Sequence, residues 1–333
     1  MIAVIGGGIS GAFAAYFLAR RGAAVTLIER DEPAAHASGN NPGGLNPLHG
    51  PGIPGPLQEL ALEAFRLHRE HFSPPPRPRL QLAVDAADAE ALERSKALYD
   101  STPGFSARWL ERDELSELEP GLDPAVRRGL WTEGNAKVDA ADYTRTVVAA
   151  ADADLVKAEV TGLRGTELRL GNGDTVSCDG IVIATGPWVA GPAAWLDVPL
   201  PVEAVDGELA LVERGAPTPV DLAWRDAAVY DAGNPRAWLG GPAGGVARIL
   251  PGLRDAHVLR RTRAPRPVTP DGLPIAGMVA DNVCLALGGG RKGMLLSAAL
   301  GLAAAELLSE GRTDLPIDPC SPERCSALSA SAA

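Results

Sequence analysis

The sequence of 333 residues predicts an α/β protein built from two units, and three observations lead to this fold class. Residues 2–5 (IAVI) are typical of a short buried strand, and spaced glycines and a helix follow them. A second glycine cluster, residues 288–290, again precedes an apolar helix. Between these ends, helical stretches and short alternating strands predict an α+β unit with a mixed or antiparallel sheet. With 46% apolar residues, the chain can bury a sizeable core.

The N-terminal segment has the spacing of a dinucleotide-binding turn. Gly6 permits the tight turn, Gly8 lets the backbone approach a pyrophosphate, and Gly11 lets the helix pack closely on the sheet. Ser10 lies in the first helical turn, whose N–H groups face the anion. Glu29 ends the second strand, residues 24–28, where a ribose-binding carboxylate belongs. These features predict a Rossmann-like unit that binds a dinucleotide.

The next segments distinguish between dinucleotides. Residues 36–50 (HASGNNPGGLNPLHG) form a polar loop where an NAD domain would have a helix. Residues 179–188 (DGIVIATGPW), 263–277 (RAPRPVTPDGLPIAG) and 288–297 (GGGRKGMLLS) follow in order. Together with residues 130–151, they resemble the D-amino-acid oxidase superfamily of FAD-dependent oxidoreductases, and glycine oxidase in particular. The loop is also similar to the FAD domain of the bifunctional tRNA wobble-uridine modification enzyme.

The resemblance implies an FAD-binding Rossmann-like domain assembled from discontinuous segments, residues 1–54, 130–195 and 263–315. Residues 55–129 and 196–262 would then form the α+β substrate domain, and residues 316–333 a frayed tail. The FAD is expected to be non-covalent, because no cysteine falls within the matched loops. Its expected contacts are Gly6, Gly8, Ser10, Gly11, Glu29, Arg30, Ser38, Gly39, Asn41, Gly43, Gly44, Leu45, Val160, Thr185, Gly186, Trp188, Gly288, Gly289, Gly290, Lys292, Gly293 and Met294.

The resemblance also implies a reaction. A hydride leaves the carbon next to a neutral amine for flavin N5, and water hydrolyses the resulting imine. Arg266 matches the family arginine that grips the substrate carboxylate, for which a planar guanidinium is suited. Arg291 is the second candidate, and His49 is placed to accept a proton from the amine or to position water. A structural role is the alternative for each of these three residues.

Departures from the family pattern bear on the substrate. The family's RGQ is replaced by residues 206–208 (DGE), and an acidic side chain that pointed inward there would repel a carboxylate. The family's GLRP appears as residues 264–267 (APRP). The chain is also shorter than typical members, so a lid is expected to be missing. These differences allow an unusual or bulky substrate.

Composition excludes several other classes of function. The net charge of −11 and the pI near 5.0 disfavour nucleic acid and anionic membranes as partners. The four cysteines contain no CxxC pair, which favours reduced thiols in a cytoplasmic protein. The abundance of Arg, Ala, Gly and Pro is typical of a bacterial protein from a GC-rich genome. His68 and His71 share a helix without a third ligand, so no metal site is expected and both are predicted to be solvated. No transmembrane segment or signal peptide is predicted.

The leading hypothesis is therefore the oxidation of a small amine or amino acid, with hydrogen peroxide as a product where oxygen is the acceptor. One alternative is the oxidation of a glycine-derived amine on tRNA, which residues 37–48 favour and the acidic net charge opposes. Oxidation of a hydroxy acid is another, because hydride transfer does not require nitrogen. The last alternative function is that of a flavoprotein subunit that depends on a partner chain. A homo-oligomer is a separate possibility for its assembly.

Overall fold

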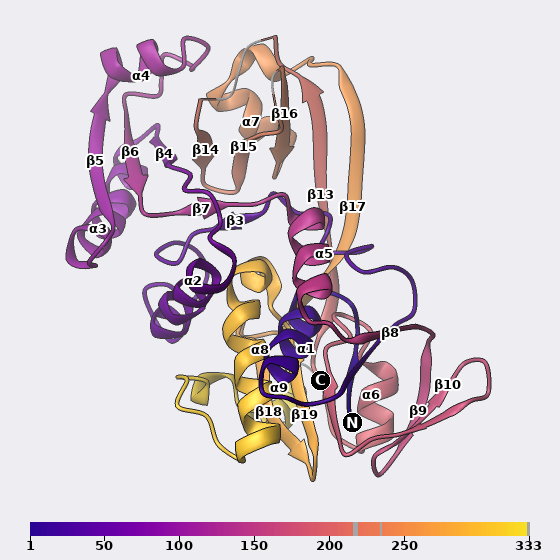
Figure 1. Ribbon diagram of the computed structural model, residues 1–333. Coiled ribbons are helices and arrows are strands. Elements are labelled where there is room, and N and C mark those ends of the chain that lie inside the picture. The colour runs from indigo at the N-terminus through magenta and orange to yellow at the C-terminus, as the bar shows by residue number, and fades with distance from the viewer. Residues whose placement is uncertain (216–218, 234, 332–333) are drawn as a thin grey trace.

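The computed structural model describes residues 1–215, 219–233 and 235–331. Within these residues the strands form two main sheets, in the upper and lower parts of Figure 1. A two-stranded sheet of β3 (Gly44–Leu45) and β7 (Ala136–Lys137) lies between them. The predicted α/β fold class is confirmed.

The lower sheet takes its six described strands from distant parts of the sequence. Neighbouring strands pair in parallel from β19 to β8, and only β18 and β19 pair antiparallel. The sheet therefore combines pieces from the beginning, middle and end of the chain, while the exact domain boundaries stay a prediction. In order, its strands are β18 (Ile275–Ala280), β19 (Val283–Leu287), β12 (Gly180–Ile183), β1 (Ile2–Ile5), β2 (Val25–Glu29) and β8 (Asp154–Lys157).

Alternate residues of β1 pack into two different hydrophobic cores, because successive side chains point to opposite faces of a sheet. Val4 packs with the helices α1 (Ile9–Arg20), α2 (Gln58–Phe72), α5 (Ala140–Ala150) and α8 (Gly293–Glu310). Ala3 and Ile5 face the other side. That side is covered by α6 (Ala190–Leu196) and a small sheet of β9 (Val160–Arg164), β10 (Glu167–Leu170) and β11 (Thr175–Ser177).

Helix α8 is the central helix of the lower layer. By length and composition alone, Gly290–Glu310 could cross a membrane. Most of this span is buried inside the protein, however, where α8 packs on α1 and α2. A Cβ at Gly301 would lie only 2.6 Å from the Phe13 Cβ, which shows how closely α8 and α1 approach. These features are those of a core helix.

The upper sheet has eight strands within the described residues. All its pairings are antiparallel except β14 with β4, so the predicted mixed sheet is confirmed. Helices α3 (Ala86–Ser101), α4 (Arg112–Leu118) and α7 (Ala243–Ile249) belong to this layer. In order, the strands are β17 (Val258–Val268), β13 (Glu203–Glu213), β16 (Arg236–Gly240), β15 (Ala227–Asp231), β14 (Asp221–Trp224), β4 (Arg79–Ala83), β6 (Arg128–Glu133) and β5 (Ser106–Glu111).

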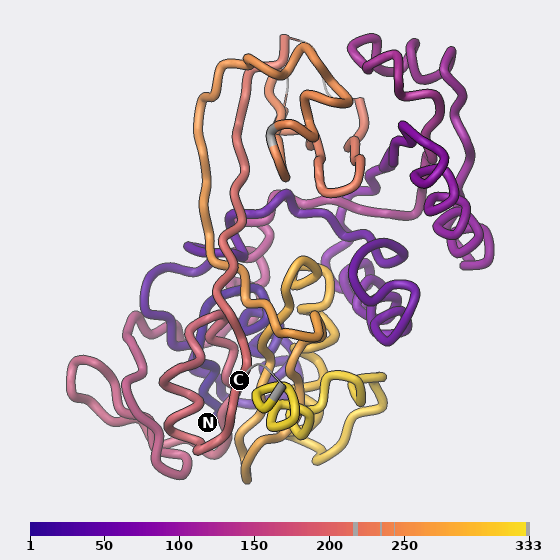
Figure 2. Tube along the Cα trace, turned by 180° about the vertical axis from the view of Figure 1, so that it is seen from behind, coloured from indigo at the N-terminus to yellow at the C-terminus, as the bar shows by residue number. Residues whose placement is uncertain are grey.

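The two long strands β13 and β17 connect the layers, running side by side from the upper sheet towards the lower one (Figures 1 and 2). Strand β17 carries Pro265 and Pro267, which have no N–H to donate. It tolerates both because it is the edge strand and pairs only with β13. The sequence motif around Arg266 is thus part of a strand rather than a loop.

Two expectations are wrong. The tail is ordered as far as residue 331, in the short turns Asp318–Cys320 and Pro322–Arg324 and in α9 (Cys325–Ser331). Arg324 anchors it, because its guanidinium lies 2.8 Å from Asp271 and donates to three backbone carbonyls. His68, predicted to be solvated, is completely buried.

Buried His68 joins three helices. Its ring lies on α2, with Nδ1 2.7 Å from the Tyr143 hydroxyl on α5 and Nε2 2.8 Å from the Leu295 carbonyl oxygen on α8. Burial lowers the pKa of His68 to about 4, so the ring is neutral near pH 7. His71 is only partly buried and lies 3.2 Å from the Tyr16 hydroxyl.

Candidate active site

A large cavity lies where the loops after β1, β2, β12 and β19 face the upper sheet. Its volume of about 1190 Å³ exceeds that of most small-molecule sites and leaves room for a dinucleotide with a second ligand beside it. The carboxyl ends of parallel strands are where α/β sheets bind ligands. Most of the predicted site residues line this one cavity.

The glycines of the first turn make its close contacts possible. Gly6 has φ of 110°, in the region that favours glycine, and a Cβ there would lie 2.4 Å from the Ala184 carbonyl oxygen. A Cβ on Gly11 would lie 1.9 Å from the Gly6 carbonyl oxygen. Gly11 therefore has the packing role that its spacing predicts, but it does not line the cavity, contrary to its predicted contact with the cofactor. Gly6, Gly8 and Ser10 line it at the N-terminus of α1.

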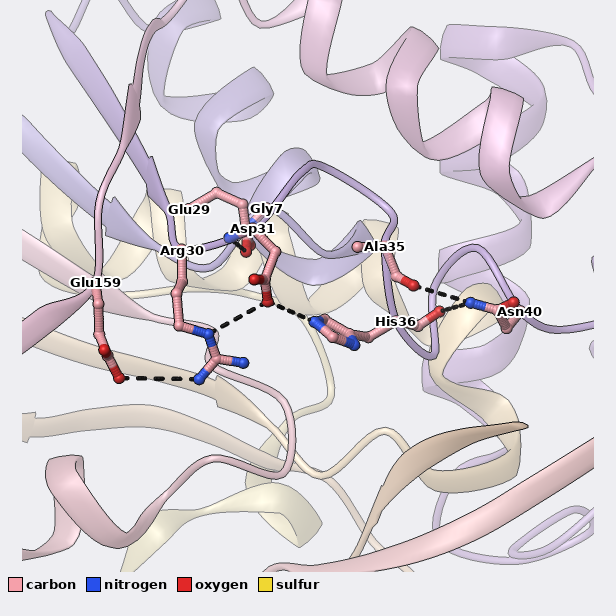
Figure 3. Close-up of polar contacts among 8 residues, drawn as sticks. All are labelled: Gly7, Glu29, Arg30, Asp31, Ala35, His36, Asn40 and Glu159. Atoms are coloured by element: carbon pink, nitrogen blue, oxygen red, sulfur yellow. Dashed lines mark hydrogen bonds and ion pairs between the residues drawn. The ribbon is translucent and has the colours of Figure 1, made fainter. Parts of the chain in front are cut away.

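Glu29 occupies the end of β2 beside this turn (Figure 3). Its carboxylate accepts hydrogen bonds from the backbone N–H groups of Gly7, at 2.5 Å, and Asp31, at 2.8 Å. A carboxylate can accept about four hydrogen bonds, so capacity remains for hydroxyl groups of a ligand in the cavity. The position fits a ribose.

Arg30 follows Glu29 and lines the cavity, and its side chain extends between Asp31 and Glu159 (Figure 3). Its guanidinium lies 3.2 Å from Asp31 and 3.9 Å from Glu159, and it stacks 4.8 Å from the centre of the Trp188 ring. Trp188 also contacts the ring of His36, and 40% of it is exposed. Val160 lines the same part of the cavity, and the Trp188 ring beside it offers an aromatic surface on which a base can stack.

The polar loop holds its shape through its own hydrogen bonds. The Ser38 hydroxyl accepts from the Ile9 N–H at 2.9 Å, and Asn41 bonds back to the carbonyls of residues 37 and 38. Ser38, Asn41 and Gly44 line the cavity. Gly39, Gly43 and Leu45 do not, contrary to their predicted contact with the cofactor. The two glycines face backbone carbonyls, and Leu45 is completely buried in the core.

The strand-to-loop turn after β12 presents Thr185 and Gly186 to the cavity. Among the described residues, the buried Thr185 hydroxyl has no hydrogen-bond partner. A buried hydroxyl without a partner is costly. It is therefore available to a polar ligand that fills this part of the cavity.

The second glycine cluster faces the opposite end of the cavity. Gly288 and Gly290 have φ of 70° and 51°, and they turn the chain from β19 into α8. Lys292 donates from Nζ to the Asn46 carbonyl oxygen at 2.6 Å. Burial, followed by the charges of Arg79 and Arg291, lowers the pKa of Lys292 to about 7. Gly289, Gly293 and Met294 also line this end.

His49 lies beside Lys292, on the same side of the cavity. Burial lowers the pKa of His49 well below its usual value, and the charges of Arg79, Lys292 and Arg291 lower it further. The imidazole is therefore neutral at pH 7 and has a lone pair with which to accept a proton.

Arg266 lies on β17 and reaches the cavity across its neighbour strand. A Cβ on Gly207 would lie 2.3 Å from the Arg266 Nε, so only glycine leaves room for this side chain. Burial lowers the pKa of Arg266, but a guanidinium stays charged. Within the described residues, no carboxylate lies within 4 Å of it.

The acidic residues beside Gly207 point the other way. Asp206 forms an ion pair with exposed Arg263, and Glu208 lies 2.6 Å from exposed Arg261. Neither acid lines the cavity. The repulsion that the sequence raised as a possibility is therefore absent from this part of the site.

Arg291 occupies the rim of the cavity. Its guanidinium lies 3.0 Å from Asp226, in the turn between β14 and β15, and both side chains are exposed. This pair joins the lower layer to the upper sheet. The other residues that line this end include Tyr230 and Arg79, which sequence analysis missed. The sequence offered one sign of Arg79: it is an arginine at the start of a mostly apolar strand (RLQLAV).

Comparisons with known proteins agree with this geometry. Residues 1–245 match the protein family described as FAD dependent oxidoreductase. Glycine oxidase of Geobacillus kaustophilus is 27% identical over 96% of this chain and 96% of its own. The crystal structure of glycine oxidase from Geobacillus kaustophilus matches with a TM-score of 0.85, covering 96% of this chain and 97% of that one.

A third relative is a tRNA 5-methylaminomethyl-2-thiouridine biosynthesis bifunctional protein of Magnetococcus marinus. It is 31% identical over 65% of this chain and 34% of its own length. The similarity of the polar loop to such proteins is thus accompanied by similarity over a longer part of the chain.

Proposed function

The chain belongs to the family of FAD-dependent oxidoreductases, and we propose that it oxidises a small amine or amino acid to an imine. The observation that carries this proposal is Arg266, a half-buried guanidinium without a carboxylate partner among the described residues, in the cavity expected to hold the cofactor. Hydrogen peroxide is the second product where oxygen is the electron acceptor.

The cavity fits FAD. We assign the pyrophosphate to Gly6, Gly8 and the N-terminus of α1, the ribose to Glu29, and the adenine to the space beside Trp188. The flavin then lies at the second glycine cluster, where the orphaned Thr185 hydroxyl and Lys292 supply polar contacts nearby. None of the four buried cysteines lines the cavity, which supports non-covalent binding.

Bound FAD supplies a two-electron acceptor for the hydride of the substrate. The chain has to orient the substrate and exclude water. Arg266 binds the carboxylate through two parallel hydrogen bonds, which directs the amine-bearing carbon towards the glycine cluster. Neutral His49 accepts a proton from the substrate's ammonium group and leaves the neutral amine, because only the neutral amine releases a hydride readily. Arg291 and Asp226 close the rim.

The test is anaerobic bleaching of the flavin absorbance. Purified holoprotein is mixed with glycine, sarcosine, D-amino acids and hydroxy acids, and the amine substrates are expected to bleach it. Arg266→Met should slow bleaching strongly. Arg263→Met is the matched control, because Arg263 lies on the same strand but pairs with Asp206 outside the cavity. Bleaching by hydroxy acids alone, or by none of the compounds, would refute the proposal.

A second candidate is the oxidation of a glycine-derived amine on modified tRNA. The similarity to the Magnetococcus marinus protein supports it. The net charge of −11 opposes binding to a phosphate backbone. Modified tRNA as a further compound in the bleaching series distinguishes the two functions, since it would reduce the flavin where free amino acids do not.

A further inference from the structure

Arg79 is a cation of the cavity that the proposed reaction does not use. It begins β4 in the upper sheet, is half-buried, and lines the cavity. Its Nε is fully buried and has no hydrogen-bond partner among the described residues. No carboxylate of the described residues lies within 4 Å of its guanidinium either. By contrast, Arg77 lies 3.6 Å from Asp221 and 3.5 Å from Asp231.

The surroundings of Arg79 are positively charged. Arg79 lines the same cavity as His49 and Lys292, and its charge contributes to lowering the pKa values of both. Like charges in a partly dry cavity repel each other, and this repulsion adds to the larger effect of burial in lowering the pKa of Lys292. An anion bound beside Arg79 would relieve it. The flavin contacts proposed above leave this guanidinium without a partner.

Arg79 is separate from Arg266. In the upper sheet β17 is the first strand and β4 the sixth, which corresponds to roughly 24 Å between their backbones measured along the sheet. Both side chains point into the same cavity, so their charged ends are closer than their backbones. The cavity therefore offers two distinct anion-binding positions.

We propose that the substrate of this enzyme carries two anionic groups, one held by Arg266 and the other by Arg79, with the oxidised amine between them. This inference rests on the proposed function and names its substrate class: an acidic amine or amino acid with a second carboxylate or a similar anion. Glycine has a single carboxylate, so it would leave the second guanidinium without a partner. Two guanidiniums fit a longer, doubly charged molecule.

The test measures binding rather than turnover. Holoprotein is titrated with α,ω-dicarboxylates of increasing length, from malonate to pimelate, and with monocarboxylates of the same carbon number, while the flavin absorbance is followed. At least one diacid should bind roughly 10- to 100-fold more tightly than its monocarboxylate counterpart, as a second charge-assisted contact provides. The length of the best diacid reports the distance between the two guanidiniums.

Variants assign the preference to Arg79. Arg79→Met should abolish it by weakening diacid binding far more than monocarboxylate binding, and Arg79→Lys should retain part of it. Arg94→Met is the matched control, because Arg94 is exposed on α3 and pairs with Glu90. Retained flavin verifies that each variant is folded.

Two results would overturn the inference. One is equal affinity of the wild type for diacids and monocarboxylates, and the other is equal weakening of both by Arg79→Met. Failure of the proposed function is seen separately. If diacids are preferred through Arg79 but no amine bleaches the flavin, the two-anion site stands and the amine oxidase function does not.

Discussion

Replacing Gly207 with alanine is expected to impair carboxylate binding while leaving the fold intact. The added Cβ would lie 2.3 Å from Nε and 2.5 Å from Cζ of Arg266. Comfortable contacts between such atoms begin near 3.5 Å, so the guanidinium has to move by about 1 Å. The atoms in conflict belong to the free end of a flexible side chain, and Gly207 lies in ordinary strand geometry.

The magnitude follows from what each group loses. Because the Arg266 side chain can shift without moving the backbone, the free energy of unfolding should fall by less than about 1 kcal/mol. A displaced guanidinium, however, loses a charge-assisted contact worth about 1.5–3 kcal/mol, or roughly a 10- to 100-fold decrease in kcat/KM. Binding should therefore change far more than stability.

The assay compares kcat/KM for the best carboxylated substrate with that for an amine without a carboxylate, and adds a thermal unfolding scan. Gly162→Ala on β9 is the control, because its Cβ would be 3.6 Å from the nearest atom and Gly162 does not line the cavity. An unchanged kcat/KM for the carboxylated substrate, or an equal decrease for both substrates, would show that Arg266 is not the carboxylate site.

Two further predictions concern the cofactor turn and the buried histidine. In Gly11→Ala the new Cβ would lie 1.9 Å from the rigid Gly6 carbonyl oxygen, so the protein should be purified with little flavin, while Gly162→Ala keeps a full complement. His68 has a folded pKa of about 4, below its ordinary value of 6.5, so the unfolded chain binds more protons between these pH values. Stability should therefore fall by up to about 3 kcal/mol between pH 6.5 and 4, and His68→Gln should flatten this slope in urea unfolding. A variant of the exposed His257 should keep the wild-type slope, and an identical slope in His68→Gln would contradict the assignment.

The parts of the fold that sequence predicts well are those with local causes. Gly6 and Gly11 are required by contacts within one strand–turn–helix unit, and the apolar runs of β1 and β12 mark strands buried on both faces. These segments could be placed to within a residue or two. The motif that contains Arg266 could be recognised in the sequence, but its conformation as a strand could not be predicted. That conformation depends on pairing with β13, which is far away in the sequence.

His68 shows an error that helix periodicity could have prevented. It follows Leu60, Ala64 and Phe65 at the spacing of one helical face, and all four residues are buried. Its polarity favoured a solvated position in the prediction. The buried position is stable because Tyr143 and a backbone carbonyl satisfy both ring nitrogens, and those partners come from other helices.

The charge of the whole chain is a poor guide to the charge of its cavity. The net charge of −11 excludes broad attraction to anions, but it is a sum over the surface. Along the cavity, Glu29 and Glu159 lie with Arg30 at the end proposed for adenosine, whereas Arg79 and Arg266 line the cavity without a carboxylate within 4 Å among the described residues. Low-dielectric walls strengthen such a local field. An acidic protein can therefore select a small, doubly anionic substrate while its outer surface repels an extended polyanion such as tRNA.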